Sequence, residues 1–169
     1  MESRISEILF IALAFILQIF ICDYVSPSPY VCLSLMPLLV MLISRRVGIY
    51  GTMLIAFGLG ILLDVLADGL VGLNAACAVL TAAFKEFNYK HIINSDRQDH
   101  THIVSIRAAG IKKFLFYLLS LVAIYMACYV FLDCVGGSSA GFILFTFAAS
   151  ALASALLCFL VGFSYLKNS

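Results

Sequence analysis

The stretch GILLDVLADG, residues 60–69, places two carboxylates in one of the most apolar parts of the chain. Asp64 and Asp68 are four residues apart, so a helix brings both onto one face, with Gly60 one turn before Asp64. A charged side chain in apolar surroundings is costly unless it is paired. Either the two aspartates form a metal-binding pair, or they belong to a helix end and turn that organise the fold.

The composition around this stretch is that of an integral membrane protein. The chain has 169 residues, of which 64% are hydrophobic and 11% charged, and its mean hydropathy is +1.12. A soluble domain would carry about a quarter of charged residues. Apolar runs recur that are long enough to cross a hydrocarbon core of about 30 Å as helices. We therefore expect an all-α membrane protein: a single polytopic domain over residues 1–169, folded as a compact bundle of about six transmembrane helices.

Proline, glycine and charged residues separate the apolar runs. SPSP (residues 26–29) follows the first run, SRR (44–46) ends the second, and ADGLVG (67–72) predicts a tight turn. The second run is short and contains Pro37, which predicts a kinked or tilted helix. Residues 85–113 form the only sizeable predicted loop. The six spans are expected at about residues 5–24, 30–44, 47–66, 70–84, 114–132 and 142–166.

The lysines and arginines predict the orientation in the membrane, because cytoplasmic loops are enriched in them. All ten fall at the two ends of the chain or in alternate connections between spans. The intervening turns, at about residues 25–29, 67–69 and 133–141, contain none. Both termini and the loop 85–113 are therefore expected to be cytoplasmic. The ten residues are Arg4, Arg45, Arg46, Lys85, Lys90, Arg97, Arg107, Lys112, Lys113 and Lys167.

The metal-binding interpretation of the two aspartates lacks its companions. Gly-x3-Asp-x3-Asp resembles the end of the CDP-alcohol phosphatidyltransferase signature, which implies a two-metal site completed by an earlier aspartate pair and an Ala-Arg. No aspartate lies between Asp23 and Asp64, and Gly51 stands where the arginine is expected. That family's site also faces the cytoplasm, whereas the basic residues place Asp64 and Asp68 on the other side. We therefore predict no metal, no cofactor and no catalytic residue.

The structural interpretation fits the neighbouring residues better. Asp64 is expected near the outer end of the third span, and Gly69 and Gly72 allow a tight turn and a close approach of helices. Asn74 can donate a hydrogen bond across the hairpin to Asp64. Such a bond between spans is worth about 0.6 kcal/mol on average, so its value lies in fixing geometry. The candidates for a structural or partner-binding role are Asp64, Gly60, Gly69, Gly72 and Asn74.

The segment FGLGILLDVLADGLVGLNAACAVLTAAF, residues 57–84, resembles the central part of the rod shape-determining protein MreD family. Members have a glycine-containing helix, an aspartate near its end, a short turn and then small residues. ILQIFI (16–21) and SPYVCLSLMPLL (28–39) add to the likeness. Asp68 is not part of the general pattern. In the branch of the family with the closest likeness, an arginine followed by a proline is common where Lys85 stands.

This resemblance implies a non-enzymatic subunit of the cell-elongation complex in the bacterial inner membrane. Such proteins bind the membrane-anchored scaffold MreC. The complex links cytoplasmic MreB filaments to peptidoglycan synthesis by RodA and a class B penicillin-binding protein, and so helps to control cell shape. The expected partners are therefore an MreC-like scaffold and the lipid bilayer, with no nucleic acid and no small-molecule substrate.

A second function class fits the same length and number of spans. The six-span substrate-binding components of energy-coupling vitamin transporters are similar in size and layout, and commonly dock their partner through an Ala-xxx-Ala face in span one. Here Ala12 and Ala14 point in different directions, and few polar groups are available to bind a ligand. Small residues at four-residue spacing in the sixth span, among them Ser150 and Ser154, favour internal packing over a partner interface.

Overall fold

A computed structural model describes residues 2–24, 32–44, 47–68, 72–93, 111–133 and 140–168. Within these ranges the regular structure is helical and contains no strand, which confirms the predicted all-α class. The elements in chain order are α1 (Glu2–Tyr24), α2 (Met36–Leu42), α3 (Gly48–Leu63), the π-helix η2 (Asp64–Asp68), α4 (Leu73–Ile93), α6 (Ile111–Asp133) and α7 (Ala140–Asn168).

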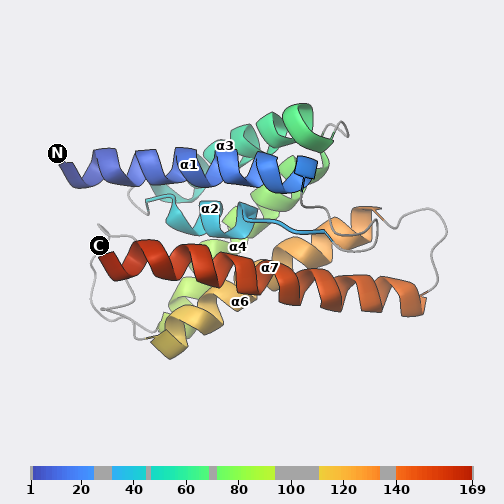
Figure 1. The fold of residues 1–169 in the computed structure, drawn as a ribbon. Coiled ribbons are helices and arrows are strands. Elements are labelled where there is room, and N and C mark those ends of the chain that lie inside the picture. Colours follow the sequence, from blue (N-terminus) through green and yellow to red (C-terminus); the bar gives the residue numbers. More distant parts are fainter. Residues whose placement is uncertain are drawn as a thin grey trace.

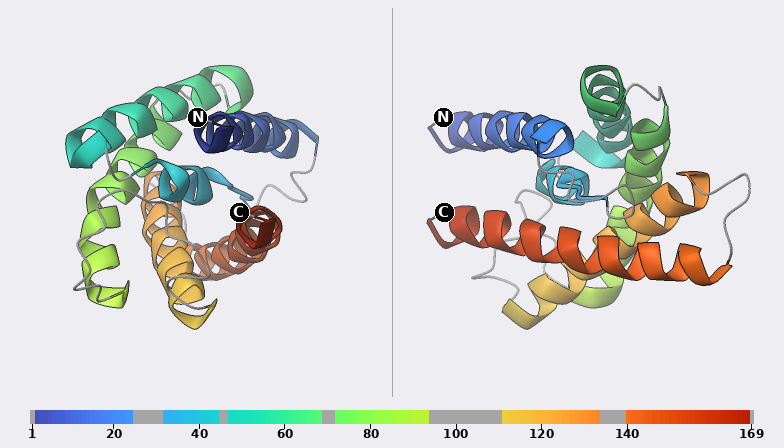
Figure 2. Two further views of the ribbon diagram at one scale, coloured as in Figure 1. Left: turned by 90° about the vertical axis from the view of Figure 1, so that its left-hand side faces the viewer. Right: turned by 45° about the vertical axis from the view of Figure 1, so that its right-hand side comes forward.

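The short helix α2 lies at the centre of the bundle. All seven of its residues are buried, and it contacts α1, α3, α4, α6 and α7. The longer helices surround it, with α3 packed on α4, α4 on α6, and α6 on α7 (Figures 1 and 2). The first helix begins and the last helix ends on the same side of the molecule (Figure 1). The chain therefore runs back and forth across the bundle and returns to its starting side.

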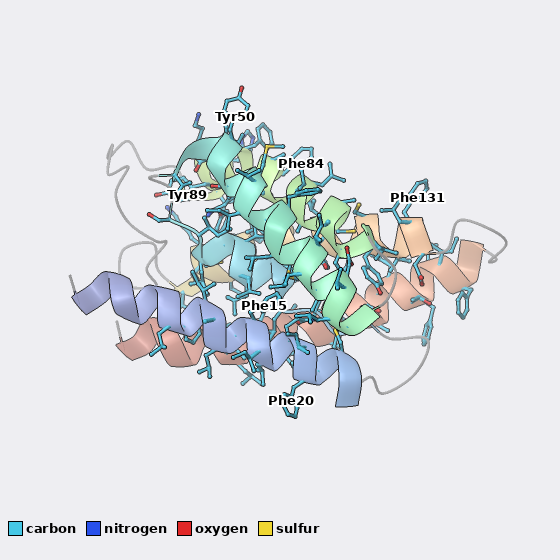
Figure 3. All side chains as sticks on the ribbon, turned by 90° about the horizontal axis from the view of Figure 1, so that it is seen from above. Phe15, Phe20, Tyr50, Phe84, Tyr89 and Phe131 are labelled. Atoms are coloured by element: carbon cyan, nitrogen blue, oxygen red, sulfur yellow. The ribbon has the colours of Figure 1, made fainter. Side chains whose placement is uncertain are left out.

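Apolar side chains fill the core and also cover much of the outside, unlike in a soluble protein. Large apolar side chains cover the outside, and Phe20, Tyr50 and Phe131 project outward whereas Phe15 faces the interior (Figure 3). Several buried polar side chains, such as Gln18, Asp64 and Lys85, form hydrogen bonds between elements. This arrangement suits a lipid solvent, which offers apolar contacts but no hydrogen bonds. The buried polar and charged residues are Gln18, Ser34, Thr52, Asp64, Asn74, Thr81, Lys85, Asn88, Thr146, Ser150 and Ser154.

Three helical stretches in the described ranges have the length and hydropathy to cross a membrane: Gly48–Ala67, Ile111–Asp133 and Gly141–Gly162. Leu9–Cys22 is a shorter apolar helix. A hydrocarbon core needs about 20 apolar helical residues, with a range of about 17 to 25. Together with the apolar exterior, these helices identify a membrane-embedded protein.

The second expected span differs from the prediction of a kinked helix. Residues 32–35 form no helix, and α2 begins only at Met36, so Pro37 lies in its first turn. Proline is tolerated there because an N–H at this position has no partner within the helix. The first backbone bond of the turn runs from the N–H of Leu39 to the carbonyl of Leu35, at 3.1 Å. Pro37 therefore helps to start a short helix rather than bending a long one.

Both ends of the predicted loop 85–113 are helical in the structure. α4 continues to Ile93 and α6 already begins at Ile111, while residues 94–110 lie outside the described ranges. The reason is that Thr81, Lys85 and Asn88 follow a helical period and are all buried. A polar face directed into the bundle lowers the average hydropathy, so the sequence pattern imitates the start of a loop.

Candidate functional site

The hairpin of α3 and α4 brings two backbones into direct contact at Gly60. A Cβ atom added at Gly60 would lie 2.4 Å from the Cα atom of Ala75 and 2.7 Å from its nitrogen. Both neighbouring atoms belong to the backbone at the start of α4, so they cannot move aside as the end of a side chain would. Gly60 therefore permits an approach between the two helices that any side chain would prevent.

Asp64 ends α3 and begins η2. It keeps α-helical dihedral angles, φ −56° and ψ −41°, and its N–H donates to the carbonyls of Gly60 and Ile61. The next turn widens into the π-helix Asp64–Asp68. Segments of this kind are rare and frequently occur at functional sites. The backbone of Asp64 is thus hydrogen-bonded within its own helix, while its side chain contacts the next helix, α4.

The Asp64 carboxylate accepts hydrogen bonds from three backbone N–H groups at the start of α4. Oδ2 accepts from Gly72 at 2.8 Å and from Ala75 at 3.3 Å, and Oδ1 accepts from Asn74 at 3.0 Å. The first N–H groups of a helix have no partner within it, and its dipole favours a negative charge there. Asp64 is completely buried. It therefore acts as a helix cap supplied by the preceding helix.

Gly72 closes the turn in the left-handed region, with φ +106°, which favours glycine. The predicted bond from Asn74 to Asp64 comes from the Asn74 backbone N–H. The Asn74 side chain forms a further link, because its Oδ1 atom accepts a bond from the hydroxyl of Tyr125 in α6 at 2.5 Å. The site therefore joins three helices, and the sequence did not single out Tyr125. Gly69 lies outside the described residues.

The donors around Asp64 fit the structural interpretation of the opening motif. Three N–H groups donate to the carboxylate oxygens and so occupy three of its roughly four lone-pair sites. For Asp68 only the backbone, in η2, is described. Among the side chains that the structure places, no group of three His, Cys, Asp or Glu comes together in a way that could hold a metal. The arrangement at Asp64 can fix a hairpin.

A second buried charge, Lys85 of α4, lies against the opposite kind of helix end. Its Nζ atom donates to the carbonyl of Val40 at 3.0 Å and to that of Ile43 at 2.5 Å. These carbonyls belong to the C-terminal end of α2, where the helix dipole favours a cation. The hydroxyl of Tyr117 in α6 donates to the Lys85 carbonyl at 3.3 Å. Lys85 therefore lies within α4 and is buried, and is not part of a loop as predicted.

The non-helical segment 32–35 has its polar backbone groups satisfied by α7 on one side. The N–H of Cys32 donates to Oγ of Ser150 at 3.1 Å, and the N–H of Ser34 donates to Oγ of Ser154 at 3.0 Å. Residues four apart in a helix are separated by about 6 Å, close to the roughly 6.7 Å between alternate residues of an extended chain. The predicted internal role of Ser150 and Ser154 is thus realised as hydrogen bonding to this segment.

On the other side of the same segment, α1 supplies a single amide. The N–H of Leu35 donates to Oε1 of Gln18 at 2.5 Å, and Nε2 of Gln18 donates to the carbonyl of Leu33 at 3.4 Å. Irregular backbone at membrane depth is tolerated only where protein or water satisfies it. Gln18 and the two serines therefore make an extended entry to α2 possible.

These contacts give the site a structural role. Side chains from α1, α3, α4 and α7 form hydrogen bonds with helix ends and with the non-helical segment 32–35. Comparison of the chain with protein family models, with curated proteins and with solved structures gives no match.

Proposed function

We propose that the chain is a non-enzymatic membrane subunit of the bacterial cell-elongation complex, and that it binds an MreC-like scaffold. The observation that carries this proposal is the use of the Asp64 carboxylate as the cap of α4. The segment that resembles the MreD family is the same segment that builds this hairpin, from Gly60 through Gly72 to Asn74. The glycines and the aspartate of this segment fix the geometry of the hairpin. A subunit that binds a scaffold needs a surface that is fixed in this way.

The proposal includes six crossings of the inner membrane with both termini in the cytoplasm. Residues 32–44 supply the second crossing in fewer residues than a full helix needs. Their six non-helical residues and the seven of α2 can span at most roughly 30 Å, because a fully extended residue covers about 3.3 Å and a helical one about 1.5 Å. The first helix starts and the last helix ends on the same side of the molecule, which supports an even number of crossings (Figure 1).

The contacts of both buried charges support a role in assembly. Asp64 accepts hydrogen bonds at the start of α4, and Lys85 donates hydrogen bonds at the end of α2. An ionisable group within a membrane indicates a function by default, and here each group has an identified structural task. Through the scaffold, such a subunit would connect MreB filaments to peptidoglycan synthesis by RodA and a class B penicillin-binding protein.

Co-purification tests the proposal directly. The tagged chain, extracted in mild detergent from cells that also express MreC, is expected to retain MreC through affinity and size-exclusion steps. Depletion in a rod-shaped cell is expected to widen or round the cell. Failure to retain MreC, combined with tight binding of a vitamin and co-purification with an ATPase module, would replace the proposal with the transporter alternative.

A pair of aspartate variants links this test to the hairpin. Asp64→Asn keeps one carbonyl oxygen but loses the charge, so we expect weaker retention of MreC together with lower thermal stability. Asp133→Asn removes a carboxylate from the exposed end of α6 and serves as the matched control, with both properties unchanged. Metal-dependent turnover lost in Asp64→Asn alone would contradict the non-enzymatic assignment.

A further inference from the structure

One end of the α4–α6 pair carries a group of exposed basic residues. Lys90 and His91 occupy the last turn of α4, and Lys112 and Lys113 occupy the first turn of α6. All four side chains are exposed. The end of α4, in light green, and the start of α6, in gold, lie at the same end of the molecule in Figures 1 and 2. The ends of α4 and α6 thus present lysines at the same end of the molecule.

Exposed apolar side chains lie one turn closer to the middle of these helices. Phe116 follows Lys112 by four residues on α6 and is 64% exposed. Phe87, 59% exposed, precedes Lys90 on α4 and stacks on the ring of His91, with centroids 5.1 Å apart. Side chains three or four residues apart share a helix face. Each helix therefore shows a cation at its end with an aromatic ring directly beneath it.

The opposite end of the α4–α6 pair has the apolar side chains without the cations. The last turn of α6 exposes Phe131 and Leu132 beside the carboxylate of Asp133. The first turn of α4 begins Leu-Asn-Ala-Ala and carries no charged residue. Because the same two helices form both ends, the charge difference marks the Lys90–Lys112 end as suited to an anionic amphiphile.

We propose that this end binds anionic phospholipid headgroups of the phosphatidylglycerol type. The ammonium groups of Lys90 and Lys112 contact the phosphodiester, and the acyl chains lie against Phe87 and Phe116. Long cationic side chains reach the headgroup region while their stems cover apolar surface. The aromatic surface beneath the cations favours a lipid over a free phosphate ion. The inference depends on membrane embedding and not on the proposed role in cell elongation.

Lipid retention by the purified chain tests this proposal. Native mass spectrometry in detergent would compare phosphatidylglycerol with phosphatidylcholine of identical acyl chains. A lysine near an anionic surface contributes a factor of about five to binding, so we expect clearly stronger retention of phosphatidylglycerol. The double variant Lys90→Gln with Lys112→Gln should lose most of this preference. The matched control, Lys90→Arg with Lys112→Arg, keeps both charges and should retain it.

Three results would overturn the proposal. These are equal retention of the two lipids by the unmodified chain, equal behaviour of the glutamine and arginine variants, and full competition by glycerol phosphate, which lacks acyl chains. Circular dichroism and size-exclusion profiles establish whether the variants fold. If the glutamine variant does not fold, the comparison of the two lipids on the unmodified chain and the competition by glycerol phosphate decide the question.

Discussion

The two buried charges Asp64 and Lys85 are stabilised in similar ways but join parts of the chain at very different separations. Asp64 caps the start of α4 from the helix directly before it, through residues 8 to 11 positions away. Lys85 lies within α4 and caps the end of α2, through carbonyls 42 and 45 positions away. Both rely on unpaired backbone groups and on the helix dipole. For Asp64 and Lys85, the backbone groups of helix ends thus supply hydrogen-bond partners of complementary polarity.

The difference lies in what each charge fixes. Asp64 sets the geometry of one hairpin, which can form from a short length of chain. Lys85 positions the central helix against α4 and so ties together elements that are distant in sequence. Removing the Asp64 side chain should therefore disturb the α3–α4 hairpin, whereas removing that of Lys85 should weaken the packing of the central helix α2 against α4.

The largest effect is expected for Asp64→Ala. The change leaves three backbone N–H groups without their acceptor inside a region that water does not reach. Each buried donor left unpaired costs about 1–3 kcal/mol, so a loss of about 3 kcal/mol or more in the free energy of unfolding is expected. Thermal or denaturant unfolding in detergent micelles measures it. A loss below that of Tyr125→Phe would show that the cap contributes little.

Lys85→Met should have the next largest effect. Methionine keeps the length and apolar stem of the side chain but leaves the carbonyls of Val40 and Ile43 without their donor. We expect a loss of about 2 kcal/mol, since two acceptors are affected and the cost of burying the cation disappears. Lys85→Arg keeps the charge, and its partial recovery of stability would distinguish charge from packing.

Gly60→Ala tests the close approach on which the Asp64 cap depends. The new methyl group would overlap the backbone of Ala75, so α4 must shift away from α3. Overpacking of this kind typically costs about 1–3 kcal/mol. Gly58→Ala is the control, because a Cβ atom there meets no other atom within 4 Å. Equal melting temperatures for the two variants would contradict the described contact.

The smallest effect is expected for Tyr125→Phe. The change removes only the hydroxyl that donates to Asn74 and keeps the buried ring. A loss of about 1 kcal/mol is expected, in line with a single hydrogen bond. The double variant with Asn74→Ala should then be little less stable than Asn74→Ala alone. Fully additive losses would show that the two side chains do not act together.

The same comparison explains what the sequence could predict. Asp64, Gly60 and Gly72 follow local rules, because a carboxylate near a helix end and glycines at a turn act on neighbouring residues. The contacts of Lys85 and Gln18 depend on which distant segments meet, and no local pattern encodes that. Hydropathy also misplaced Lys85, since a polar face turned into a membrane bundle has the composition of a loop. The all-α class was predictable because the composition indicates a membrane protein and the apolar runs are long enough to span as helices.

Amide hydrogen exchange in detergent tests the central claim, that the Asp64 carboxylate caps α4, most directly. In the unmodified chain, the N–H groups of Gly72, Asn74 and Ala75 are expected to exchange slowly, because each donates to the carboxylate. In Asp64→Asn these three amides should exchange faster, while amides of α2 near Lys85 keep their rates. Unchanged exchange at Gly72, Asn74 and Ala75 in a folded Asp64→Asn variant would contradict the claim.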